Sequence, residues 1–95
     1  MIEQLNKGFE SRVRLGIMAV LAVNEWVDHA QLKELLGVTD GNLASHLSAL
    51  EQLKYVQVRK RFLGKRPNTS YKASAAGARA FRDHLDAIER LIPKA

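Results

Sequence analysis

The sequence predicts a mainly helical α+β fold with one small β-hairpin, and three observations support this fold class. Apolar residues recur at helical spacing in four segments of the chain. After the third segment the pattern changes to the apolar–polar alternation that is typical of strands. Turn-forming residues interrupt this alternation once, so we expect two strands joined by a tight turn. The expected order of elements is α-β-α-α-β-β-α.

The first helix is expected between about residues 10 and 23, and a short strand follows it. Its apolar residues have the spacing of one helix face, and they are Val13, Ile17, Val20 and Leu21. Asn24 is expected to end the helix. Glu25–Val27 is too short for another helix, so we expect a small strand there.

Two short helices come next and meet across a turn of about three residues that contains a glycine. Asp28 and Thr39 offer side-chain oxygens to the free amides at the two helix starts, and Gly37 is suited to end the first of the two. The expected core residues are Leu32, Leu35 and Leu36 on one helix and Leu43, Leu47, Leu50 and Leu53 on the other. This arrangement is a helix-turn-helix, expected at about residues 28–53.

The expected hairpin covers about residues 55–73 and carries all of the positive charge excess. Val56, Val58 and Phe62 alternate with polar residues, and Gly64–Asn68 supplies the turn. The chain has 15 Lys and Arg against 10 Asp and Glu, a net charge of +5. Seven of these bases lie at positions 54–72, where no acid occurs, which leaves eight bases and ten acids elsewhere. We therefore expect a local anionic partner rather than a generally basic surface.

A last helix is expected at about residues 74–92, with an apolar row on one side. A length of 95 residues suits one compact domain, so we expect residues 1–95 to form a single domain. The three earlier helices and the hairpin already supply the core of this domain, so we expect apolar residues of the last helix to extend beyond it. We expect a two-fold dimer interface made by Leu5, Phe9, Phe81, Leu85, Ile88 and Ile92. Packing of this row on its own domain is the alternative.

A helix-turn-helix followed directly by a basic hairpin is the winged-helix arrangement, and the sequence resembles one family at residue level. Segments 10–18 and 32–47 are similar to the opening helix and the helix-turn-helix of MarR/ArsR-like transcriptional regulators of bacteria and archaea. Segments 55–58 and 64–71 are similar to their wing, and the resemblance covers about residues 9–92. It implies a stand-alone winged-helix domain that binds double-stranded DNA and dimerises through its terminal helices.

The DNA contacts are expected on the second helix of the helix-turn-helix and on the hairpin. A recognition helix presents the face opposite its buried stripe to the major groove. The expected contacts there are Thr39, Gly41, Asn42, Ser45 and His46, with Asn42 suited to adenine and His46 to guanine or phosphate. Asp40 is expected to cap the helix rather than to contact DNA. On the hairpin, Arg59, Arg61, Lys65 and Arg66 are expected at the minor groove and phosphates.

Two interpretations that involve no DNA binding compete with these contacts. The helix face can be an ordinary solvated surface, and the cations can be a charged edge that prevents strand aggregation. The second interpretation explains poorly why acids are absent from the whole segment 54–72. We therefore favour DNA as the partner.

The sequence predicts a homodimeric, sequence-specific transcriptional regulator of double-stranded DNA. A winged-helix module for protein–protein interaction or for RNA binding is the alternative. An enzyme is not expected, because the chain offers no partnered nucleophile, no Gly-rich phosphate loop and no paired carboxylates. Neither a cofactor nor a metal is expected, because cysteine is absent and the three histidines lie on separate elements. No residue pattern indicates a small-molecule effector.

A cytoplasmic location without membrane contact is expected. The longest apolar run, Ile17–Val23, is far shorter than a membrane span. The amino-terminal residues lack the basic-then-apolar order of a signal peptide.

Overall fold

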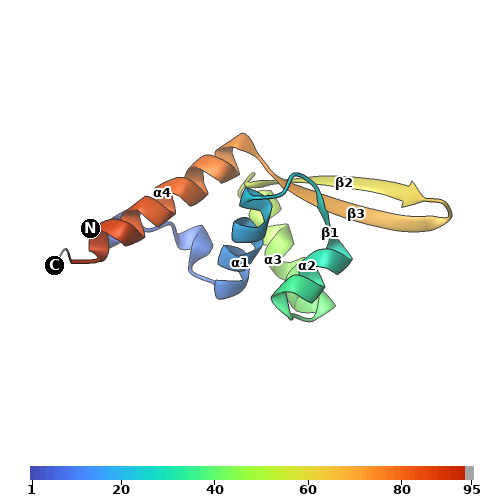
Figure 1. Ribbon diagram of the computed structural model, residues 1–95, viewed down its shortest axis with the longest axis horizontal. Coiled ribbons are helices and arrows are strands. Elements are labelled where there is room, and N and C mark those ends of the chain that lie inside the picture. Colours follow the sequence, from blue (N-terminus) through green and yellow to red (C-terminus); the bar gives the residue numbers. More distant parts are fainter. Residues whose placement is uncertain (94–95) are drawn as a thin grey trace.

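The computed structural model describes residues 1–93 and has the predicted order of helices and strands, preceded by two short 3-10 turns. Figure 1 shows the elements along the chain. Their bounds are η1 Ile2–Gln4, η2 Lys7–Phe9, α1 Arg12–Ala22, β1 Val27–Asp28, α2 His29–Leu36, α3 Asp40–Gln52, β2 Val56–Leu63, β3 Arg66–Ala73 and α4 Ala75–Leu91. The expected α+β fold class is confirmed, and α1 ends two residues before the predicted stop at Asn24.

Side-chain caps explain why the helices begin where they do. The carboxylate of Asp28 accepts the backbone N–H of Gln31, whose side chain in turn accepts the backbone N–H of Asp28. The hydroxyl of Thr39 accepts the N–H of Asn42, and that of Ser74 accepts the N–H of Gly77. Gly37 ends α2 in the left-handed conformation at φ 64°, as expected.

The sheet is small and antiparallel, with strand order β1-β3-β2. Strands β2 and β3, which we call the wing, pair from Val56 opposite Ala73 to Leu63 opposite Arg66. Gly64 and Lys65 form the turn between them, and Gly64 has a φ of 64°, which glycine adopts without steric penalty. The molecule measures 55 × 25 × 22 Å, and the wing projects from the helices at the end opposite to the amino-terminal segment and the last turn of α4 (Figure 1).

The core forms where α1 meets α2, α3 and the base of the wing. Its most completely buried large side chains are Ile17, Met18, Leu32, Leu43 and Leu50. Two predicted core residues are instead exposed, Leu35 at 66% and Leu53 at 44%, and Phe62, on the apolar side of the predicted alternation, is 72% exposed. Leu35 lies on the solvent side of the short helix α2. Leu53 is the C-cap of α3, where the chain turns away, and Phe62 lies on the part of the wing that extends beyond the helices.

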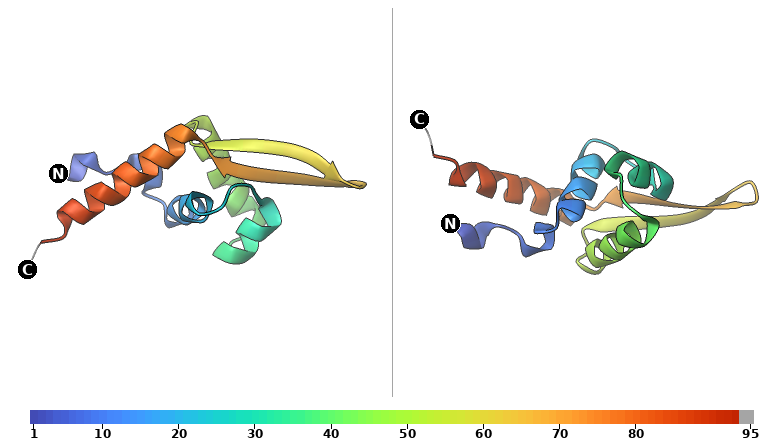
Figure 2. Two further views of the ribbon diagram at one scale, coloured as in Figure 1. Left: turned by 45° about the horizontal axis from the view of Figure 1, so that its top comes forward. Right: turned by 90° about the horizontal axis from the view of Figure 1, so that it is seen from below.

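Helix α4 fully buries only one residue of the predicted apolar row, Phe81. Its buried residues are Gly77, Phe81, His84 and Ala87, whereas Leu85 and Ile92 are exposed at 45% and 63%. The amino-terminal segment runs along this helix (Figure 2), and the backbone N–H of Asn6 donates to Nδ1 of His84 at 3.0 Å. This hydrogen bond satisfies an imidazole that would otherwise be costly to bury.

The structure corrects the expected role of two aromatic residues. Phe9 and Phe81 are 3% and 8% exposed, and their rings pack edge to face with centroids 5.9 Å apart. Both side chains therefore belong to the core of one chain and leave almost no surface for a partner. The alternative interpretation, packing of the row on its own domain, holds for Phe81, while Leu5 and Ile88 are half-buried.

Candidate nucleic-acid interface

Helix α3 has one buried stripe and one open face. Leu43, Leu47 and Leu50 point into the core. On the open side, the structure places the predicted contacts Gly41, Asn42 and Ser45, all of them exposed. Ala44, Ser48 and Gln52 are exposed there too, although sequence reasoning missed them. Ser48 follows Gly41 and Ser45 at helical spacing, so a full helical projection of the sequence would have found it.

At the start of α3, the Thr39 hydroxyl is used as a cap, whereas Gly41 and Asn42 are open to solvent. Thr39 is exposed, but its hydroxyl accepts the backbone N–H of Asn42 at 3.2 Å. No atom lies within 4 Å of a Cβ placed on Gly41, so this position is open to a close approach. The start of the helix therefore offers an accessible backbone together with the exposed Asn42 side chain.

His46 lies at the edge of the open face rather than at its centre. It is half-buried, and its Nδ1 accepts a hydrogen bond from Nε of Arg14 on α1 at 3.1 Å. Because arginine only donates hydrogen bonds, the proton of the neutral imidazole is on Nε2. His46 therefore presents a donor, which suits an acceptor such as guanine N7 or O6, or a phosphate oxygen.

Asp40 joins the two helices of the helix-turn-helix, which corrects its expected role as a cap. Its carboxylate oxygens lie 3.1 Å from Nζ of Lys33 and 3.2 Å from Nε2 of His29, whereas Thr39 caps the helix. The hydrogen bond from Lys33, together with its charge and a weaker contribution from His29, lowers the pKa of Asp40 below its ordinary value of 3.8. The carboxylate is thus partly neutralised on a surface where an isolated acid would repel phosphate.

Three of the four predicted wing cations are exposed toward the far end of the hairpin. Lys65 is in the turn, Arg66 starts β3, and Arg61 lies on β2 with Nε 3.4 Å from Oδ1 of Asn68. Lys60 is exposed as well, and sequence reasoning missed it because it does not lie on the polar side of the predicted alternation. The outer part of the wing therefore carries four cations and no acid.

Arg59 is placed differently from the other wing cations. Its guanidinium carbon lies 4.3 Å from the ring centroid of Trp26, and its Nε is buried without a hydrogen-bond partner. Lys72 approaches the same ring at 5.8 Å and pairs with Glu25 at 3.3 Å. These contacts attach the base of the wing to the segment before β1 through a cation–π interaction.

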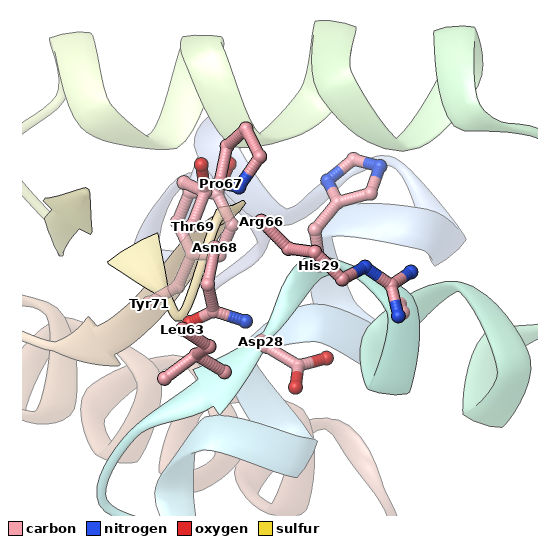
Figure 3. A pocket seen from close by; sticks show the side chains of 9 residues that line it. Asp28, His29, Leu63, Arg66, Pro67, Asn68, Thr69 and Tyr71 are labelled. Atoms are coloured by element: carbon pink, nitrogen blue, oxygen red, sulfur yellow. The ribbon is translucent and has the colours of Figure 1, made fainter. Parts of the chain in front are cut away.

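A hollow of about 540 Å³ separates the start of α2 from the wing (Figure 3). Its polar lining mixes charge types, with the carboxylate of Asp28, the imidazole of His29 and the guanidinium of Arg66. This mixture does not select an ion of one sign. Within residues 1–93, no three His, Asp or Glu side chains gather as a metal site. No helix in the same range is long and apolar enough to cross a membrane.

The comparisons with known proteins agree with this geometry. A family model described as a winged helix DNA-binding domain matches residues 13–92. The chain belongs to this winged-helix family. The expected resemblance to a winged-helix domain of transcriptional regulators is confirmed at the level of the winged-helix family, over residues 13–92.

Two relatives match the chain over most of its length. It is 38% identical over 85 residues to an uncharacterized protein of Methanocaldococcus jannaschii, MJ0432, covering 90% of this chain and 92% of that one. A transcriptional regulator homologue from Pyrococcus horikoshii OT3 is 28% identical and superimposes with a TM-score of 0.78, covering 94% and 93% of the two chains.

A more distant relative shows the same fold. MepR of S. aureus, solved as a complex with DNA, is 11% identical with a TM-score of 0.78, over 95% of this chain and 73% of that one. Several of the structural neighbours are described as transcriptional regulators or repressors.

Proposed function

We propose that the chain is a sequence-specific regulator that binds double-stranded DNA as a homodimer. One observation carries the proposal: the same winged helix has an exposed face on α3 and a basic wing that contains no acid. The family description and the MepR–DNA relative support DNA as the partner. Localised cations of this kind attract phosphates in any sequence, whereas the helix face supplies groups that distinguish bases.

In this proposal α3 lies in the major groove and the wing lies over the flanking backbone and minor groove. Asn42 is suited to pair with adenine and His46 to donate to guanine, while Ser45 reaches a base edge or phosphate. Arg61, Lys65 and Arg66 contact phosphates or the minor groove. Arg59 is assigned to bracing the wing, because Trp26 covers its guanidinium.

The dimer proposal is supported by apolar surface at the end of the molecule opposite to the wing. Leu85, Leu91 and Ile92 are 45%, 39% and 63% exposed on or after α4. Beside them, Leu5 and Ile88 line an open hollow between the amino-terminal segment and α4. A two-fold axis through this end would set two α3 helices about one DNA turn, ~34 Å, apart on a palindromic site.

The test is selection of bound fragments from a pool of genomic duplexes, followed by affinity measurements over a range of salt concentrations. We expect one palindromic motif to be enriched, and the affinity to fall steeply with salt at a logarithmic slope of about −0.9 per phosphate contact. Binding that does not change with salt would contradict the proposal. A preference for structured RNA over duplex DNA at matched salt would favour the RNA-binding alternative, and a heteromeric protein partner without duplex binding would favour the interaction module.

A further inference from the structure

The wing tip, residues 62–67, is apolar as well as basic. Phe62 is 72% exposed and Leu63 is 53% exposed, although large apolar side chains are normally buried. In the strand register Phe62 lies opposite Pro67, and Leu63 lies opposite Arg66. Because neighbouring residues of a strand point to opposite faces, the tip has apolar side chains on both faces. Packing in the core therefore does not account for Phe62.

The charges around the tip restrict what these apolar side chains can meet. Lys60, Arg61, Lys65 and Arg66 flank them, and no acid occurs anywhere in residues 54–72. A partner that suits the tip therefore has a negatively charged surface and an apolar interior that the Phe62 and Leu63 side chains can reach. Duplex DNA has both, since its phosphates border a minor groove floored by stacked bases. Phe, Leu and Pro are among the residues that proteins insert as wedges between base steps.

The wing is also built to hold such a wedge in place. Eight residue pairs join β2 to β3, and the two-residue turn at Gly64 and Lys65 closes the hairpin tightly. At the base, Arg59 stacks over Trp26 and Lys72 pairs with Glu25. A braced hairpin loses little conformational entropy on binding, so binding energy remains available to unstack bases.

We propose that the wing tip is an apolar wedge, in which Phe62 and Leu63 enter the minor groove, open a base step and bend the DNA. This inference rests on the proposed duplex binding and adds a deformation of the DNA to it. Lys65 and Arg66 hold the adjacent phosphates while the side chains insert. Steps that unstack easily, such as TA, are the favoured sites, so the wing contributes to sequence choice without hydrogen bonds to bases.

The experiment uses a duplex of about 30 base pairs that contains TA steps, with a fluorophore at each end and 2-aminopurine at one step. The wild-type chain is expected to raise energy transfer between the ends and to raise 2-aminopurine fluorescence, which increases when the base is unstacked. The double variant Phe62→Ser, Leu63→Ser is expected to lose both signals. Its salt slope stays unchanged, and its affinity changes by less than about tenfold, because the lost contacts are offset by the avoided unstacking.

Val23→Ser is the matched control, since Val23 is 81% exposed in the loop before β1 and is not part of the wing tip. It is expected to bend and unstack DNA like the wild type. Wild-type binding without bending or unstacking would overturn the wedge alone, as would full bending by the double variant. Absence of duplex binding by the wild type at low salt would instead overturn the proposed function. Binding to anionic lipid vesicles that depends on Phe62, with unaltered DNA bending in the double variant, would assign the tip to a membrane surface and overturn the wedge.

Discussion

Individual side chains on α3 and on the wing differ in what they can recognise. Asn42 is exposed near the start of α3, and its amide has both a donor and an acceptor. Lys65 lies in the wing turn and presents a single positive charge. Base edges differ between sequences, whereas phosphates do not, so the two residues are expected to affect binding in different ways.

We expect Asn42→Ala to cost about 1–3 kcal/mol of binding free energy on the preferred duplex and to reduce discrimination against altered sequences. Lys65→Ala is expected to weaken binding to all duplexes alike and to make the salt slope shallower by about one contact. Both quantities come from titrations of the preferred and a scrambled duplex at several salt concentrations. Equal losses on every sequence for both variants would contradict base reading by Asn42.

His84 gives a second prediction at this scale, because its protonation is coupled to folding. Burial lowers the pKa of His84 below its ordinary value of 6.5, and Nδ1 must be unprotonated to accept the Asn6 N–H. Between the lowered value and 6.5 the unfolded chain binds the proton more readily than the folded chain. Stability contributed by neutral His84 is therefore complete above about pH 6.5 and is lost as the pH falls through the folded pKa.

Urea unfolding of the wild type and of His84→Asn at about pH 7.5 and about pH 5 measures this effect. Asparagine retains an acceptor but does not titrate in this range, so the variant is expected to lose less stability on acidification. Glu3 and Glu10 line a hollow together with His84, and both proteins retain these two residues. The same pH dependence in both proteins would show that His84 does not contribute.

At the scale of the elements, the close contact between α4 and Tyr55, the residue before β2, depends on one glycine. A Cβ added to Gly77 would overlap the carbonyl oxygen of Tyr55 and would lie 2.9 Å from the Tyr55 Cα. The same carbonyl accepts the backbone N–H of Ser74 at 3.0 Å, so it is fixed in place. Helix α4 can approach the sheet here only because residue 77 has no side chain.

We expect Gly77→Ala to destabilise the fold by about 1–3 kcal/mol, because the steric clash exceeds the gain of about 1 kcal/mol in helix propensity. Gly41→Ala is the matched control on α3, since no atom lies within 4 Å of its Cβ position. It is expected to leave stability unchanged or to raise it by up to about 1 kcal/mol. Thermal and urea unfolding of both variants measure the difference, and an equally stable Gly77→Ala protein would contradict the contact.

Local signals account for what could be predicted at this scale. The caps at Asp28 and Thr39 and the stop at Gly37 act within a few residues, so they were visible in the chain. The environment of His84 could not be predicted from the sequence, because its hydrogen-bond partner Asn6 is 78 positions away and donates through its backbone N–H. The stacking of Arg59 on Trp26 likewise joins residues from distant segments. The spacing on the last helix predicted an apolar row. Which of its residues are buried depends on the other segments of the chain that pack against each face of the helix.

At the scale of the whole molecule, opposite ends of a 55 Å long chain carry different surfaces. The basic wing lies at one end, and the carboxyl-terminal part of α4 and the amino-terminal segment lie at the other (Figure 2), where Leu91 and Ile92 are exposed. The basic end could be predicted from the positions of Lys and Arg. The apolar end was predicted in part, since Leu85 and Ile92 are exposed, whereas Phe9 and Phe81 are buried in the core.

The double variant Leu85→Asp, Ile92→Asp tests whether two copies associate through the apolar end. Both side chains are exposed in the single chain, so the fold is expected to survive while buried carboxylates disfavour an interface. We expect a dimeric wild type and a monomeric variant by sedimentation. The variant should lose its preference for a palindrome over a half-site, because the linked second contact is gone. Val23→Asp, an equally polar change on an exposed loop residue, should stay dimeric. A monomeric wild type that still prefers the palindrome would place the coupling between copies on the DNA instead of on α4.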